Sequence, residues 1–283
     1  MFGFRSDGRK VKTVPAFFKV IPNVMKTRND SEVFFKQDIS LTEMDEYISK
    51  KAAEGINISY MNIIYAAIVR ILSQRPELNR FAMHGNIYAR NEILVSLAIK
   101  KSLTDEGQET TTKISYTGKE NIFEVKQKID EVIGQNKDYA TSNNTDDFAK
   151  IISKIPTWIV RIIINILMFM DKRGFLPKAV IDASPFHTSA FLTNVGSLGI
   201  DSIYHHLYNF GTTSLFFAMG KKKKSYVYED DEIKQEKCIT LAFVGDERIC
   251  DGYYYASSFK QLQKYLKHPE LLEENVERKE DIK

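Results

Sequence analysis

The chain has 283 residues, a length that suits one large domain or two small ones and that can bury a core without disulfide or metal staples. Hydrophobic residues make up 43% and charged residues 27%, which excludes the intrinsically disordered, collagen-like and coiled-coil classes. The 40 basic and 37 acidic residues leave a net charge of +3, which is too small and too mixed to indicate a nucleic-acid partner.

Cysteine content and hydropathy favour a cytoplasmic protein. The two cysteines, Cys238 and Cys250, are too few for a disulfide framework. The N-terminal residues contain no uninterrupted apolar core of a signal peptide. The most apolar stretch, 155–170, contains Arg161 and Asn165 and is shorter than the roughly 20 residues that a membrane span needs.

The first half of the chain predicts strands interrupted by pairs of helices. Ser40 and Glu43 have the spacing of a capping box, which predicts a helix that ends at Gly55. A second helix is predicted from the period of its apolar residues, which fall on one face. In order, the predicted elements are a strand at 33–38, helices at 40–55 and 59–73, strands at 93–99 and 110–116, a helix around 123–132 and a polar loop at 142–147.

The second half predicts an apolar helix followed by a strand-rich region. Its predicted elements are a helix at 155–170, strands at 189–193 and 214–219, a hairpin turn at 229–232, a strand at 238–244 and a helix at 251–266. Because strands and helices do not alternate regularly, we expect an α+β fold with a mixed sheet. The charged segment 270–283 predicts a solvated tail.

General motifs of phosphate or metal binding are not found in the sequence. The G-K-K-K-K run at 220–224 is not a phosphate loop, because position 215 is leucine where that motif requires glycine. His187, His205 and His206 could be imagined as metal ligands. Adjacent residues on a strand point to opposite faces, so we interpret the last two as polar loop or interface residues and predict no metal site.

Three segments in order resemble a known family. The sequence F-V-G-D-E-R-I-C-D-G at 243–252 resembles the signature D-H-R-x-x-D-G of the acyltransferase core of 2-oxoacid dehydrogenase complexes and H-H-x-x-x-D-G of chloramphenicol acetyltransferase. F-L-T-N-V-G-S-L-G at 191–199 is similar to the family's strand and turn with a catalytic hydroxyl. R-P-E-L-N at 75–79 resembles a helix exit in its first half, and the likeness runs over 9–266.

The resemblance implies a fold and an assembly. The fold would be an α/β (α+β) two-layer sandwich like that of chloramphenicol acetyltransferase, a mixed sheet with helices packed on one face. Residues 1–269 would form a single catalytic domain, with no lipoyl or subunit-binding domain before it, and 270–283 a charged tail. The family assembles as homotrimers with each active site between two subunits. Coenzyme A enters from one side and the acyl partner from the other.

The resemblance also assigns roles to residues near 193 and 221. Thr193 takes the place of the hydroxyl that donates a hydrogen bond to the oxyanion, and the alternative is a strand threonine bonded to backbone. Lys221 lies where the acetyltransferases have a lysine near coenzyme A, and the run to Lys224 would attract its phosphates. The alternative for these lysines is a solvated hairpin flank. Asn194 is placed with them on the coenzyme side.

The D-G pair of the signature has a structural role in the family. Asp251 would hold the loop by pairing with an arginine, for which Arg9 is a candidate by its order in the chain. Gly252, which we also assign to coenzyme binding, would allow a close backbone approach at the start of the helix.

The catalytic histidine of the family is replaced by Glu247, between Asp246 and Arg248. An imidazole with a pKa near 6.5 suits proton transfer at neutral pH, whereas a carboxylate is ordinarily a weaker base towards a thiol. Glu247 would act as a base only if burial or a neighbouring carboxylate such as Asp251 raised its affinity for a proton. Otherwise it is an ion-pair partner in a former active site, or the alignment is displaced.

Two functions follow. The first is acyl transfer between coenzyme A and a thiol, hydroxyl or amine acceptor, with Glu247, His187, His205 or His206 as the base. The second is an inactive trimeric relative that binds coenzyme A or an acyl ligand as a scaffold.

The apolar helix at 155–170 is an additional departure from the family. Trp158, Ile162 and Ile166 lie on one broad apolar face, which predicts burial in the core or a contact between subunits. The alternative for this face is contact with a membrane surface or an acyl chain.

Overall fold

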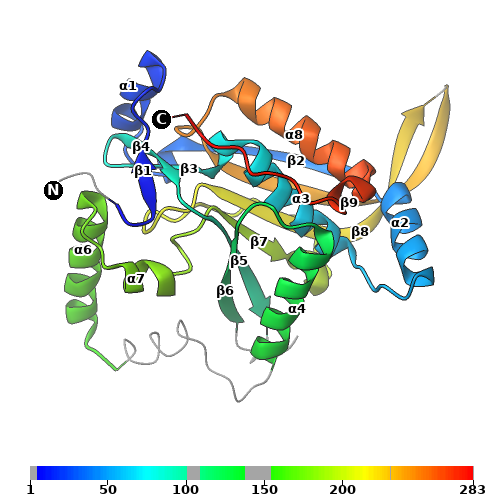
Figure 1. The fold of residues 1–283 in the computed structure, drawn as a ribbon, viewed down its shortest axis with the longest axis horizontal. Coiled ribbons are helices and arrows are strands. Elements are labelled where there is room, and N and C mark those ends of the chain that lie inside the picture. Colours follow the sequence, from blue (N-terminus) through cyan, green and yellow to red (C-terminus); the bar gives the residue numbers. More distant parts are fainter. Residues whose placement is uncertain (1–4, 101–108, 138–153, 230, 283) are drawn as a thin grey trace.

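The computed structural model describes residues 5–100, 109–137, 154–229 and 231–282 (Figure 1). The strands are β1 (Gly8–Lys10), β2 (Glu32–Ser40), β3 (Arg80–Met83), β4 (Asn86–Arg90), β5 (Ile93–Lys100), β6 (Glu109–Tyr116), β7 (Ala190–Asn194), β8 (Leu215–Glu229) and β9 (Glu232–Asp246). The α-helices are α1 (Ala16–Val24), α2 (Thr42–Ala53), α3 (Tyr60–Gln74), α4 (Ile122–Lys137), α6 (Thr157–Arg173), α7 (Lys178–Ala183) and α8 (Gly252–Lys267). Short 3-10 helices are η1 (Asn29–Ser31), η2 (Pro76–Asn79), η3 (Val195–Leu198) and η4 (Pro269–Leu272).

Six strands form the main sheet, in the order β2-β9-β8-β7-β5-β6. The pairs β5–β7 and β7–β8 are parallel, and the other neighbours are antiparallel. A smaller antiparallel sheet has the order β1-β4-β3. The mixed sheet that the lack of regular alternation predicts is therefore confirmed.

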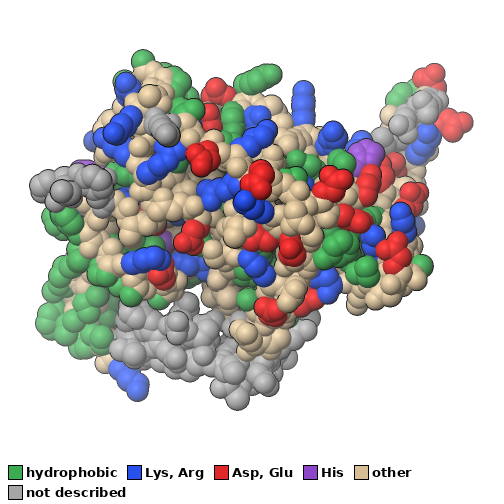
Figure 2. All heavy atoms as spheres, viewed as in Figure 1, with side chains coloured by type: hydrophobic (Ala, Val, Ile, Leu, Met, Phe, Trp, Pro, Cys, Tyr) green, Lys and Arg blue, Asp and Glu red, His purple; other side chains and the backbone are tan. Residues whose placement is uncertain are grey.

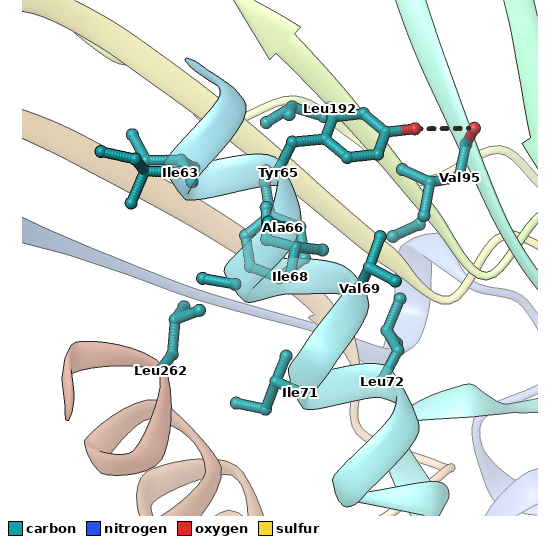
Figure 3. Packing of buried hydrophobic residues seen from close by; sticks show 14 of the residues in the cluster. Ile63, Tyr65, Ala66, Ile68, Val69, Ile71, Leu72, Val95, Leu192 and Leu262 are labelled. Atoms are coloured by element: carbon teal, nitrogen blue, oxygen red, sulfur yellow. Dashed lines mark hydrogen bonds between the residues drawn. The ribbon is translucent and has the colours of Figure 1, made fainter. Parts of the chain in front are cut away.

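Helix α3 lies at the centre of the core because nearly its whole length is apolar. Its N-cap is Ser59, whose hydroxyl accepts a hydrogen bond from the Asn62 backbone N–H. The Asn62 side-chain oxygen in turn accepts a hydrogen bond from the Ser59 backbone N–H, which completes a capping box. Figure 3 shows its apolar side chains between the sheet and Leu262 of α8. The buried Tyr65 hydroxyl donates to the Val95 carbonyl oxygen at 3.3 Å, which satisfies its polar atom inside the core (Figure 3).

The helices α2, α3, α4 and α8 pack on one face of the main sheet, where they share a single apolar cluster with it. The opposite face carries Phe191, Phe216 and Val244, which pack against Leu207 of the segment after β7. Because strand residues alternate between faces, these two clusters come from successive positions of the same strands. The predicted two-layer architecture, with helices on one face, is confirmed.

Most predicted elements are found, but the proposed capping box at Ser40 is wrong. Ser40 is the last residue of β2 and pairs with Cys238, so its hydroxyl lies outside the helix and bonds to Thr42. The helix α2 has Leu41 at its N-cap and no side-chain cap. The sequence patterns also missed α1, α7, β1, β3 and β4. The predicted loop at 142–147 lies outside the described residues.

The C-terminal segment does not extend into solvent as predicted. Asp281 forms a bidentate ion pair with the buried Arg80, with both N–O distances at 2.6 Å. The Lys279 amide donates to the Ser73 carbonyl oxygen at 3.0 Å, and Leu272 is 1% exposed. The prediction failed because the charges of the segment are partners of buried arginines, which sequence spacing does not reveal.

Strands β8 and β9 form a hairpin longer than the two predicted strands, and it extends beyond the body of the molecule (Figure 1). Its turn lies within the predicted 229–232, where Glu229 pairs with Glu232 and Asp231 has a φ of 62°. In the part that extends past the core, residues 224–229 of β8 pair with residues 232–237 of β9. The side chains of Tyr226, Tyr228 and Ile233 in this part are exposed.

The apolar helix predicted at 155–170 is α6, which ends at Gly174 with a φ of 76°. Its expected burial in the core is not observed: Trp158, Ile162, Ile166 and Phe169 are about half exposed or more. Figure 2 shows the resulting apolar surface at the end of the molecule that α6 occupies in Figure 1. Within the described ranges, no helix combines the length and the apolar character needed to cross a bilayer.

Candidate active site

Thr193 lies near the end of β7 on the sheet face that the large helices do not cover. Ala190 and Leu192 point into the helix-covered core and Phe191 into the opposite cluster, so the alternation of the strand places Thr193 on the same face as Phe191. The residue is half-buried and pairs with Ala218 of β8. A small neighbour of this kind leaves space beside the hydroxyl.

The turn after Thr193 is held tightly against β8. The Asn194 side-chain oxygen accepts the Ser197 amide at 3.2 Å, so this side chain caps η3. A Cβ atom added at Gly196 would lie 2.4 Å from the Gly220 carbonyl oxygen, a distance that only glycine avoids. The turn and the backbone next to Lys221 are therefore in direct contact, which brings together two of the predicted site segments.

The lysines of the 221–224 run have different environments. Lys221 is exposed, and its amide donates to the Ile200 carbonyl oxygen at 2.9 Å. Lys223 pairs with Asp38 at 3.2 Å and Asp201 at 3.1 Å, and Lys222 lies over the ring of Tyr60 at 4.1 Å. The register shifts between Met219 and Lys222, which explains why the run does not simply alternate between faces.

His205 lies in the segment that crosses the face of Thr193. Its ring stacks on Phe216 with centroids 4.2 Å apart and planes inclined by 7°. Its Nδ1 lies 2.8 Å from the His206 carbonyl oxygen, which can only accept, so Nδ1 carries the proton and Nε2 is the acceptor. His205 and His206 lie in a loop, as predicted, and their two rings stack on each other.

Metal-ligating side chains do not gather in the part of the chain that the structure describes, where no group of three or more His, Cys, Asp or Glu residues could hold an ion. His187 is fully buried, with Nδ1 at 2.8 Å from the Ser184 hydroxyl and Nε2 at 3.2 Å from Asp171. Both ring nitrogens of His187 are therefore engaged away from Thr193.

Glu247 follows the end of β9 and is exposed. Its amide donates to the Ser31 carbonyl oxygen at 2.8 Å, which fixes the backbone but not the carboxylate. Its neighbours Asp246 and Arg248 form a buried bidentate pair at 2.8 and 2.7 Å. Arg248 is thus committed to Asp246, and the Glu247 carboxylate points to the surface of this copy.

Asp251 has a different partner from the predicted arginine, and the coenzyme contact predicted for Gly252 stays a prediction. The Asp251 side chain accepts the Tyr254 amide at 2.7 Å and caps α8. Arg9 is not its partner, because the Arg9 guanidinium donates to the carbonyl oxygens of Asp281 and Ile282. A Cβ atom at Gly252 would meet nothing within 4 Å, so no close approach requires glycine there.

The sheet register separates Thr193 from Glu247 in one copy of the chain. Thr193 is level with Ala218 on β8 and with Ala242 on β9, and Glu247 is five residues beyond Ala242. With a rise of about 3.3 Å per residue and strands about 4.8 Å apart, the two residues lie roughly 16 Å apart along the strands and 10 Å across them. They cannot act on the same carbonyl group within one copy.

Comparisons with known proteins agree with this architecture. Residues 186–273 match the family model of the 2-oxoacid dehydrogenases acyltransferase catalytic domain. A probable dihydrolipoamide acetyltransferase from Listeria monocytogenes has 16% identity and a TM-score of 0.59, with 95% of this chain and 98% of that chain covered. The fold is that of the chloramphenicol acetyltransferase-like acyltransferases.

Two other solved structures have the same fold. Dihydrolipoamide acetyltransferase of Azotobacter vinelandii has 12% identity and a TM-score of 0.58, covering 93% of this chain and 94% of that chain. A chloramphenicol acetyltransferase has 12% identity and a TM-score of 0.55, covering 92% and 99%. The search of curated proteins gave no match. The family match begins after the first half, whereas the structural likeness extends over nearly the whole chain.

Proposed function

We propose that the protein transfers an acyl group between coenzyme A and a thiol, hydroxyl or amine acceptor, at a site assembled from two copies of the chain. The observation that carries this proposal is the position of Thr193. It lies on the sheet face that the large helices do not cover, beside a small residue and just before a turn that contacts the backbone next to Lys221. A hydroxyl held in this way suits an oxyanion donor.

The register argument supports a shared site. Because Thr193 and Glu247 lie far apart in one copy, a reaction that uses both needs Glu247 from a neighbour. The Azotobacter structure concerns the roles of a serine, a histidine and an asparagine in catalysis, the last two four positions apart, as are Glu247 and Asp251 here. A closed ring of three copies, with each Glu247 beside the next Thr193, would satisfy the geometry.

The proposed reaction proceeds by direct attack. The Glu247 carboxylate takes the proton of the acceptor, whose freed lone pair forms a bond to the thioester carbonyl carbon. The carbonyl oxygen becomes an oxyanion that accepts a hydrogen bond from the Thr193 hydroxyl. Collapse breaks the carbon–sulfur bond, and the coenzyme A thiolate takes the proton back from Glu247.

Lys221 and Lys224 are the lysines best placed for the phosphates of coenzyme A. Both are exposed, whereas Lys223 is already paired with Asp38 and Asp201. Asn194 and Gly252 are not needed as direct coenzyme contacts, because Asn194 caps η3 and Gly252 begins α8. We place Asp251 in the framework that orients the 247–252 loop.

His205 is the alternative base. It shares the sheet face of Thr193 within one copy, and among the described residues its Nε2 has no hydrogen-bond partner, whereas Nδ1 lies against the His206 carbonyl oxygen. A His205→Asn variant keeps a donor near the Nδ1 position and removes the Nε2 base, with His206→Asn as the matched control. With Glu247 as the base, His205→Asn retains most of the activity, whereas a loss of about 10²-fold in kcat would move the role to His205.

The experiment that tests the function measures free coenzyme A released from acetyl-CoA and longer acyl-CoAs with thiol, alcohol and amine acceptors. Release that depends on an acceptor and is lost in Glu247→Gln supports the proposal. Absence of release with every combination would contradict it. Gain of acetyl transfer by Glu247→His in an otherwise inactive protein would identify the inactive, ligand-binding relative instead.

A further inference from the structure

A cavity of about 540 Å³ opens between α1, the turn that joins β3 and β4, and the C-terminal part of α6. Neither Thr193 nor Glu247 lines it, although Arg248, the neighbour of Glu247, does. Its fully charged side chains are all basic and come from three different segments: Lys26 and Arg28, Lys172, and Arg248, of which Arg248 is already paired with Asp246. A cavity with this lining favours an anion.

Arg28 is the residue whose charge is not balanced by the protein. It is 3% exposed, and the hydrogen bonds of its guanidinium go to the carbonyl oxygens of Ala82 at 3.2 Å and of Tyr208 and Asn209 at 3.4 Å. Its Nε is buried without a partner. Among the described residues no carboxylate lies within ion-pair distance of it. Burial lowers the pKa of Arg28 to about 10, against the opposing charge of Asp246.

The nearest acidic groups are already engaged. The Asp246 carboxylate accepts from Arg248 at 2.8 and 2.7 Å and from the Ser31 hydroxyl at 3.0 Å. The Asp171 carboxylate pairs with Arg5 at 2.7 Å, and Arg5 also pairs with Asp7. Buried charges in proteins are normally paired, so the unmatched Arg28 indicates a partner that binds from the cavity.

From these observations we propose that the cavity binds the phosphate group of a phosphate ester. Lys26 and Lys172 are exposed on opposite sides of the cavity, and Asn23 and Thr27 add neutral donors. A phosphate offers three acceptor oxygens and close to two negative charges, which matches several cations better than a single carboxylate does. The volume exceeds what an inorganic phosphate fills and leaves room for the ester group.

The surroundings of the cavity allow two sources of the phosphate. Phe17 and Val20 of α1 and Ile166 and Phe169 of α6 are all exposed, and Figure 2 shows the apolar surface at the position of α6. A phospholipid headgroup would place its chains beside these side chains, whereas a soluble phosphate ester would not use them. The shared chemistry is the phosphate, and the experiment separates the two sources.

The test uses a double variant at the exposed lysines, Lys26→Gln with Lys172→Gln, since neither side chain supports the core. The matched control is Lys260→Gln with Lys264→Gln on α8, which removes the same charge from another exposed surface. Binding of inorganic phosphate and of glycerol phosphate is measured by titration calorimetry and by the rise in Tm, with sodium chloride at equal ionic strength as the reference. We expect the Kd for phosphate to be at least tenfold weaker in the Lys26 and Lys172 variant and to be unchanged in the control variant.

A vesicle arm identifies the source. Sedimentation with phosphatidylcholine vesicles is compared with vesicles that also contain phosphatidic acid. Binding to the acidic vesicles that is lost with the Lys26 and Lys172 variant supports the site with a lipid headgroup as its ligand. Binding of the soluble phosphates alone supports it with a soluble ester.

Absence of binding in both arms would overturn the proposal, and so would binding that is equal in both variants. Coenzyme A binding serves as a separate readout. Its proposed contacts, Lys221 and Lys224, lie at the other end of the sheet from the cavity, so the Lys26 and Lys172 variant leaves coenzyme A binding unchanged, and failure of the acyltransferase proposal would not affect the phosphate result.

Discussion

At the scale of single residues, the Thr193 hydroxyl is the group with the most specific proposed role. Thr193→Ala removes the donor and leaves the β7 backbone pairing intact, so we predict a loss of about 10²-fold or more in kcat. Thr193→Ser keeps the hydroxyl and should retain most of the rate. Steady-state kinetics with the best acyl-CoA measures both variants, and equal rates for Thr193→Ala and the native protein would remove the oxyanion role.

The buried His187 gives a pH dependence of stability. Burial lowers the pKa of His187, and the negative charge of Asp171 only partly offsets this effect. Just below the ordinary histidine pKa, His187 is therefore protonated in the unfolded chain but still neutral in the folded chain. The stabilisation is complete above about pH 6.5 and is lost as the pH falls below that value. Asp171 adds a loss at lower pH, because His187 and Arg5 hold its pKa at about 2 despite burial.

Urea unfolding between neutral pH and pH 5 tests this assignment. The native protein should lose stability across that range, and His187→Gln should lose less of it because the glutamine cannot take up a proton. His206→Gln is the control at an exposed position. The same pH slope in native protein and His187→Gln would place the effect elsewhere.

Which residues could be predicted depended on whether their partners are close in sequence. Asp251 caps α8 through the backbone N–H of Tyr254, which is only three residues away. The family resemblance had instead implied an arginine partner for Asp251. Arg28, Arg80 and Arg90 are buried by contacts with residues more than 50 positions away, and no periodic pattern marks them. Their charges looked like surface charges in the sequence, which is why the cavity at Arg28 was not predicted.

At the scale of elements, the contact between the 193–199 turn and β8 is a tight one. Gly196→Ala forces a methyl group against the Gly220 carbonyl oxygen, so we expect a cost of about 1–3 kcal/mol in unfolding free energy and a displaced Thr193. Gly134→Ala in α4 meets nothing within 4 Å and should stabilise by about 0.5–1 kcal/mol. Denaturant titration compares the two, and a neutral Gly196→Ala would show that the turn yields easily.

The C-terminal segment acts as a structural element through its ion pair with Arg80. Asp281→Asn leaves Arg80 buried, with Glu77 as its one acidic partner among the described residues, so we predict a loss of about 3 kcal/mol in unfolding free energy. Glu280→Gln removes a neighbouring exposed charge and should change stability by less than about 0.5 kcal/mol. Equal effects of the two variants, measured by urea unfolding, would mean that the segment is solvated after all.

Long elements could be predicted from the period of their apolar residues, whereas the short strands could not, because they are too short to show a period and depend on pairing with distant segments. Helix α3 and strands β5 and β7 have apolar patterns that a sequence window detects. Strands β1, β3 and β4 are three to five residues long and exist because they pair with one another. The apolar face of α6 was detected, but whether such a face is buried depends on what the fold places against it.

At the scale of the whole molecule, the fold supplies the two halves of the proposed site at different places on the sheet. Thr193 and the lysines after Met219 lie towards one end, and Glu247 lies at the other end of β9. The phosphate cavity lies beside Arg248, away from the protruding β8–β9 hairpin. In the proposed function, a single copy presents half of the site at each end, and acyl transfer requires assembly.

Mixing two inactive variants tests this dependence most directly. Thr193→Ala and Glu247→Gln are co-expressed with different tags, and mixed assemblies are isolated and assayed for acyl transfer. In a shared site the first variant contributes an intact Glu247 and the second an intact Thr193. One of the three sites in each mixed ring is then complete, so about a third of the native activity should return in the isolated mixed assemblies. Activity no higher than that of the separate variants would contradict a site built from two copies.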